Sequence, residues 1–138
     1  MGRPTEITKK MLLDLGITEI TRTGHVFQGN IEILPHILTK KTRYGIKQYK
    51  VIGVYSNEIY QEHRKTDPKA TCGTKTIVLS RAIWAWHKGI CPARMDVDHI
   101  NNDSLDDRLD NYQLLTRSEN LAKRKGNVNQ YGLRKKDR

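Results

Sequence analysis

Cysteines, aromatic residues and long apolar runs are all scarce in this chain of 138 residues. Its two cysteines, Cys72 and Cys91, form no C-x-x-C pair, so we expect no structural zinc site. A single phenylalanine and an apolar content of 36% predict a thin core with extended basic surfaces. No stretch is apolar enough to cross a membrane, and the N-terminus lacks the apolar core of a signal peptide. We therefore expect a soluble, intracellular protein of one modest domain.

Basic residues, in contrast, are abundant, with 25 lysines and arginines against 15 acids and a net charge of +10. The acids are unevenly distributed, because residues 96–110 contain six of them and one base, Arg108. That window carries a charge of −5, and the remainder of the chain carries +15. A basic protein with an acidic island suits a nucleic-acid-binding cation site, since bases meet phosphates and carboxylates meet the cation. A solvated acidic loop on a ribosome-like protein is the plainer alternative, and charge does not exclude it.

The stretch 96–125 has the strongest local pattern. Residues 95–99 alternate apolar and polar side chains, which predicts a short strand. Residues 101–107 are polar and predict a loop, and residues 112–115 predict a second strand.

A capping box then predicts a helix. Thr116 is followed three residues later by Glu119, so the helix should begin there and run to about residue 125, where Gly126 would end it. Asn120 lies one turn into this helix, with bases at intervals of three and four residues. These bases are Arg117, Lys123 and Arg124.

Four polar residues of this stretch match a known pattern. They are Asp98, His99, Asn111 and Asn120, with twelve residues from the histidine to the first asparagine and nine from there to the second. The spacing resembles that of HNH nucleases in their Asp-His, Asn, Asn variant, as in the small HNH endonucleases of bacteriophages and intron-borne homing systems. The likeness is close over residues 79–125 and weak upstream. It implies a ββα-metal arrangement that hydrolyses phosphodiester bonds.

The resemblance also implies roles. Asp98 and Asn120 are expected to hold one divalent metal ion, and their oxygens suit Mg²⁺ or Mn²⁺ better than zinc. His99 is expected to act as the general base toward water, because imidazole exchanges protons near neutral pH. Asn111 is expected to orient His99 through its side-chain amide. The plain alternatives are a structural histidine and a turn asparagine.

Contacts with the DNA backbone are expected from basic side chains, including Lys123 and Arg124 on the predicted helix. Either Arg108 or Arg117 can clamp the scissile phosphate. A cluster between residues 40 and 50 reads as a phosphate-contacting surface or as a solvated face, and we favour phosphate contact beside a nuclease motif. Its members include Lys40, Lys41 and Arg43.

Two departures from the family pattern concern the metal. Where relatives usually carry asparagine before the loop arginine, this chain has Asp106 and Asp107, so an extra carboxylate is expected near the cation. Some HNH enzymes place a third histidine on the helix, where this chain has Asn120. Asparagine favours Mg²⁺ or Mn²⁺ over softer metals.

Upstream, apolar spacing predicts a packing helix over residues 5–15 that Gly16 ends. Short β-like segments over residues 17–60 predict a small antiparallel sheet, and residues 60–74 predict an exposed loop. A strand over residues 75–79 then precedes a helix capped by Ser80. Its apolar stripe consists of Leu79, Ala82, Ile83 and Trp86.

The predicted fold class is α+β, with a ββα-metal (HNH) nuclease motif after a helix and a small antiparallel strand-rich region. We expect residues 1–74 to contact DNA, residues 75–126 to form the nuclease motif, and residues 127–138 to form a flexible basic tail. The expected function is metal-dependent cleavage of double-stranded DNA by a phage or mobile-element enzyme in the bacterial cytoplasm.

A DNA-binding protein that keeps the fold without catalysis is the alternative, and a basic RNA-binding protein is a third reading. Nicking and double-strand cutting both stay open, as does the oligomeric state. A monomer with one such site would nick.

Overall fold

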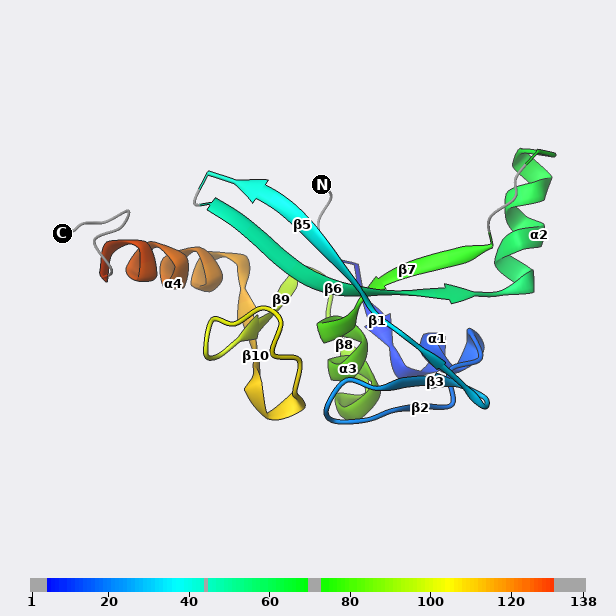
Figure 1. The fold of residues 1–138 in the computed structure, drawn as a ribbon, viewed down its shortest axis with the longest axis horizontal. Coiled ribbons are helices and arrows are strands. Elements are labelled where there is room, and N and C mark those ends of the chain that lie inside the picture. The colour runs from blue at the N-terminus through cyan, green and yellow to red at the C-terminus, as the bar shows by residue number, and fades with distance from the viewer. Residues whose placement is uncertain (1–4, 44, 70–72, 131–138) are drawn as a thin grey trace.

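The computed structural model describes residues 5–43, 45–69 and 73–130, with side chains up to residue 123. Strands and helices are mixed along the chain, and helix α3 (Leu79–Lys88) lies near the middle of the molecule (Figure 1). The expected α+β class is therefore confirmed. In this part of the chain, no helix is both long and apolar enough to pass through a bilayer.

The N-terminal segment forms a strand and then a helix. β1 (Ile7–Thr8) pairs antiparallel with β8 (Ile90–Cys91), a partner far along the chain. The helix α1 (Lys9–Asp14) begins later than predicted, because Thr8 is extended and its hydroxyl accepts the N–H three residues on at 3.1 Å. It ends just before Gly16, at φ +91°, as expected.

The strands expected over residues 17–60 are present, but in two sheets. The first is an antiparallel meander of β2 (Glu19–Ile20), β3 (Val26–Gln28) and β4 (Ile31–Ile33). The second contains β5 (His36–Thr42), β6 (Gly45–Tyr55) and β7 (Thr74–Val78). β5 and the first half of β6 form a mostly exposed hairpin, residues 36–50, which we call the arm (Figure 1).

Helix α2 (Asn57–Thr66) shows that the loop predicted over residues 60–74 is wrong in its first part. The segment is rich in good helix formers, with Glu58 in the first turn and bases in the last, which suits the helix dipole. None of its residues is buried, so it lacks the apolar stripe that made α3 recognisable. It ends ahead of Pro68, which cannot continue a helix.

Helix α3 is the centre of the core. Its predicted stripe is buried, and it consists of Leu79, Ala82, Ile83 and Trp86. The helix begins one residue before the expected Ser80 cap, and Ser80 is buried in the first turn. Gly89, at φ +92°, ends it.

The core draws on both regions of the chain. Buried side chains from before residue 75 belong to the same cluster as α3, and they are Leu12, Ile17, Ile20, Val26, Ile52 and Val54. Cys91 lies in this cluster as a free thiol, and its burial raises the pKa of that thiol. Cys72 lies outside the described residues. The segments before and after residue 75 therefore share one core.

Strand, loop, strand and helix follow in the predicted order after residue 94. β9 (Met95–His99) pairs antiparallel with β10 (Tyr112–Thr116). A single 3-10 turn, η1 (Leu109–Asn111), leads the loop into β10.

Helix α4 (Arg117–Gln130) begins at the predicted capping box. The N–H of Thr116 donates to Glu119 Oε1 at 2.8 Å, and the N–H of Glu119 donates to Thr116 Oγ1 at 3.2 Å. The helix continues past Gly126, so its predicted end is wrong; an interior glycine costs only about 1 kcal/mol. The tail predicted for residues 127–138 begins inside α4, and residues 131–138 lie outside the described part.

Candidate active site

The register of β9 and β10 separates the two adjacent motif residues. Asp98 lies opposite Gln113, and His99 lies opposite Tyr112. Because side chains alternate along a strand, Asp98 shares a face with Asp96, and His99 points to the other face. Pairing remains regular through His99, without the bulge that would turn both motif side chains to one side.

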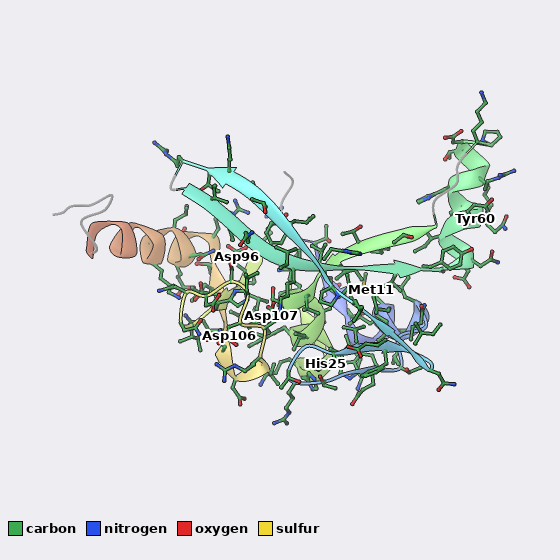
Figure 2. The ribbon with its side chains drawn as sticks, in the orientation of Figure 1. Met11, His25, Tyr60, Asp96, Asp106 and Asp107 are labelled. Atoms are coloured by element: carbon green, nitrogen blue, oxygen red, sulfur yellow. The ribbon has the colours of Figure 1, made fainter. Side chains whose placement is uncertain are left out.

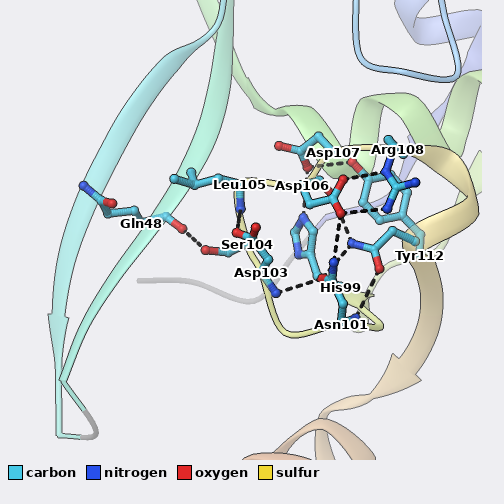
Figure 3. Close-up of polar contacts among 11 residues, drawn as sticks. Gln48, His99, Asn101, Asp103, Ser104, Leu105, Asp106, Asp107, Arg108 and Tyr112 are labelled. Carbon is cyan, nitrogen blue, oxygen red and sulfur yellow. Dashed lines mark hydrogen bonds and ion pairs between the residues drawn. The ribbon is translucent and has the colours of Figure 1, made fainter.

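On its face, His99 is held by a carboxylate. Nε2 of His99 lies 2.9 Å from Oδ1 of Asp107, and the Tyr112 hydroxyl donates to the same oxygen at 2.6 Å (Figure 3). The His99 and Tyr112 rings meet edge to face, with centroids 5.3 Å apart. Burial, followed by the hydrogen bond to Asp107, raises the pKa of Tyr112.

Asn111 braces the loop. Its Nδ2 donates to Asn101 Oδ1 and to the carbonyl oxygen of Asp106, each at 3.0 Å, and its Oδ1 accepts the N–H of Asn101 at 3.1 Å. The resemblance implies a hydrogen bond from Asn111 to the His99 ring, but among the described residues Asn111 makes no such bond. Asp107 occupies that place instead. The sequence signal was its position before the loop arginine, but we had expected this carboxylate beside the cation.

Asp98 faces α4 and meets a lysine. Lys123 Nζ lies 2.5 Å from Asp98 Oδ2, and the carbonyl oxygens of His99 and Ile100 lie 3.1 and 3.4 Å from the same ammonium. Gln113 Nε2 also donates to Asp98 Oδ2, at 2.8 Å. Lys123, which we had expected to face DNA, thus points inward and is surrounded by oxygens.

Asn120 lies one turn earlier on α4 and bonds a different carboxylate. Its Nδ2 donates to Asp96 Oδ2 at 2.9 Å, so Asn120 and Asp98 have separate partners. Within the described residues, no group of three or more histidines, cysteines and acids is arranged to hold a metal. The Asp98 carboxylate and the Asn120 amide are hard oxygen donors on the α4 side of the hairpin, which fits Mg²⁺ or Mn²⁺. At Asp98 the Lys123 ammonium lies where a bound metal ion would lie.

Arg108 forms a bidentate ion pair with Asp106 within the loop. Its Nε and Nη2 donate to the two carboxylate oxygens of Asp106 at 2.7 and 2.8 Å. These bonds, aided by one from Asn101, hold the pKa of Asp106 at about 2. Figure 2 shows Asp96, Asp106 and Asp107 on the same side of the molecule, away from Tyr60 on α2.

A cavity of about 570 Å³ lies between the arm and the β9–β10–α4 unit. Its lining includes His99, Asn120 and Arg117 from that unit. The arm contributes Lys40 and Lys47, which are cross-strand partners and therefore point to one face. Ser104 Oγ donates to the carbonyl oxygen of Gln48, and this hydrogen bond connects the loop to the arm (Figure 3).

The other predicted DNA contacts do not line this cavity. Lys41 is adjacent to Lys40 in β5 and so points to the opposite face of the arm. Arg43 lies in the turn at the tip of the arm. The side chain of Arg124 lies outside the described set.

A comparison with protein families matches residues 78–122 to a model described as HNH endonuclease. The matched segment contains α3, β9, β10 and the start of α4, and with them Asp98, His99, Asn111 and Asn120. Searches of curated proteins and of solved structures gave no significant match. Residues 78–122 are therefore similar to the HNH endonuclease family.

Proposed function

We propose that this protein is a metal-dependent DNA endonuclease in which His99 takes the proton from the attacking water. The observation that carries the proposal is that His99 lines the same cavity as Lys40 and Lys47, so a base lies where phosphates would be held. The water proton passes to His99 while the water oxygen bonds to phosphorus and the bond to the 3′ oxygen breaks. The departing oxygen takes a proton from solvent, which leaves a 5′-phosphate and a 3′-hydroxyl.

Asp98 and Asn120 are the residues that would hold one Mg²⁺ or Mn²⁺ ion. When bound, the ion would stabilise the charge on the phosphate and on the departing oxygen. β9, the loop, β10 and α4 then act together as a ββα-metal unit. Binding requires the Lys123 ammonium to leave Asp98, and the four-carbon lysine stem is flexible enough for this movement.

The proposed substrate is double-stranded DNA, held by its backbone. Lys40, Lys47 and Arg117 face the cavity from two sides and can pair with consecutive phosphates. Lys41, Arg43 and Arg124 are further candidates for backbone contacts around it. We propose a single site that nicks one strand, in a phage or mobile-element enzyme of the bacterial cytoplasm.

A DNA-binding protein without catalysis is the second candidate. The ion pair of Asp98 with Lys123 favours it, because that pair occupies a proposed metal ligand. A nicking assay on supercoiled plasmid with Mg²⁺ separates the two candidates. If the protein is a nuclease, the parent should produce nicked circles with Mg²⁺. Neither the parent with EDTA nor the His99→Ala variant should produce them. Plasmid binding without nicking, in Mg²⁺ or in Mn²⁺, would instead establish the binding protein.

A further inference from the structure

Asp107 is a buried carboxylate within a loop whose other residues are exposed or half-buried. Its side chain is 4% exposed, and its Oδ1 contacts both His99 Nε2 and the Tyr112 hydroxyl (Figure 3). Among the described residues, its Oδ2 is buried without a hydrogen-bond partner. Burying a carboxylate is unfavourable unless it is paired, so its contact with His99 calls for an explanation beyond loop packing.

Tyr112 determines which nitrogen of His99 carries the proton. Burial raises the pKa of Tyr112, so its hydroxyl keeps its proton and donates a hydrogen bond to Asp107 Oδ1. A carboxylate oxygen can only accept, so His99 Nε2 is the donor in the second contact. In the neutral ring, Nδ1 is then the nitrogen with a free lone pair.

The N-terminal meander supports Asp107 from behind. The carbonyl oxygen of Asp107 lies 3.1 Å from the position that a Cβ on Gly24 would take. The N–H of Leu109 donates to the carbonyl oxygen of Arg22 at 2.7 Å. The turn between β2 and β3 therefore packs against the backbone around Asp107 and limits its movement.

We infer that Asp107, supported by Tyr112, is a positioning residue that fixes His99 with its proton on Nε2 and Nδ1 free. The inference rests on the proposed function, since it affects cleavage only where His99 is the base. An asparagine at this position can accept the same hydrogen bond but carries no charge.

Long-range ¹H–¹⁵N NMR of full-length, histidine-labelled protein without metal tests the geometry directly. With the ring neutral, His99 of the parent should show a protonated Nε2 and an unprotonated Nδ1. Asp107→Ala should give a mixture of tautomers, whereas the matched control Asp110→Ala, at an exposed position in η1, should keep the parent pattern. A proton on Nδ1 in the parent would overturn the inference whether or not Asp107→Ala folds, as would an unchanged pattern in Asp107→Ala.

Cleavage kinetics then test the consequence. Asp107→Ala should lower kcat by roughly 10- to 100-fold, the usual cost of losing a group that orients another. The KM for DNA and the metal midpoint should stay near those of the parent, and Asp107→Asn should recover much of the loss. A parent that shows the expected tautomer but cleaves no DNA would reject the proposed function and keep the positioning. A parent that cleaves while Asp107→Ala matches its kcat would reject the positioning alone.

Discussion

Lys123 Nζ lies 2.5 Å from Asp98 Oδ2, so helix α4 places its own positive charge on the carboxylate that we propose as a metal ligand. The two side chains are 24% and 12% exposed, so water screens this pair only in part. Metal binding at Asp98 therefore competes with an ammonium built into the chain.

Lys123→Gln should strengthen metal binding. Removing the ammonium frees Asp98, and a partly exposed ion pair is worth about 1 kcal/mol, which corresponds to roughly fivefold in affinity. Calorimetric titration with Mn²⁺ in the absence of DNA measures the change. Lys10→Gln, which removes an exposed pair with Asp14 on α1, is the matched control and should bind metal like the parent. Weaker binding by Lys123→Gln would show that the lysine supports the site.

The cross-strand lysines of the arm should contribute to DNA affinity. Lys40→Ala with Lys47→Ala should weaken binding and reduce the log–log salt slope by about 1.8, which is 0.9 for each lost phosphate contact. Binding of a labelled duplex over a range of salt concentrations gives the slope. Lys9→Ala with Lys10→Ala on α1, away from the cavity lining, removes the same charge and should change the slope less. Equal changes in both double variants would mean that only net charge matters.

Asp106 should contribute stability that acid removes. Its pKa is lowered in the folded protein to about 2, against about 3.9 when unfolded. A group whose pKa is lower in the folded state than in the unfolded state stabilises the fold fully when the pH is above the unfolded pKa. It loses this contribution as the pH falls through the folded pKa. In urea unfolding, Asp106→Asn should therefore be less stable than the parent above about pH 4, and the gap should close toward pH 2. Asp110→Asn is the control, and a gap that persists at pH 2 would contradict the ion pair as its source.

Gly24→Ala should disturb both stability and the site. Gly24 has φ +95°, where an alanine is strained by about 1–2 kcal/mol, and the new Cβ would lie 3.1 Å from the carbonyl oxygen of Asp107. Gly29 also has a positive φ, at +66°, but nothing lies within 4 Å of its Cβ position. Gly24→Ala should lose more stability in urea unfolding and more plasmid-nicking activity than Gly29→Ala. Similar losses would assign the whole effect to backbone strain.

Local patterns predicted the unit that carries the site, because its signals are short-range. The alternation over residues 95–99 and the capping box at Thr116 each depend on neighbours within a few residues. The pairing of β1 with β8 was not predictable in this way, because it joins segments distant in sequence. Helix α2 was missed because none of its residues is buried.

The sequence predicted the positions of the proposed site residues in the fold better than it predicted their contacts. The spacing placed Asp98 and His99 on the hairpin and Asn120 on the helix, which the structure shows. It did not reveal that Asp107 reaches His99 or that Lys123 turns inward to Asp98. Both contacts depend on how the loop folds back and on how α4 crosses the hairpin, and neither follows from local pattern.

The measurement that tests the central claim most directly is plasmid nicking against metal concentration for the parent, His99→Ala and Asp98→Ala. If His99 activates the water and Asp98 holds the ion, His99→Ala should lower the plateau by roughly 10²- to 10⁴-fold with little shift of the midpoint. Asp98→Ala should instead move the midpoint to higher metal concentration, with partial recovery in Mn²⁺. Exchanged behaviour would reverse the two roles, and a His99→Ala variant that nicks like the parent would contradict the assignment of this site.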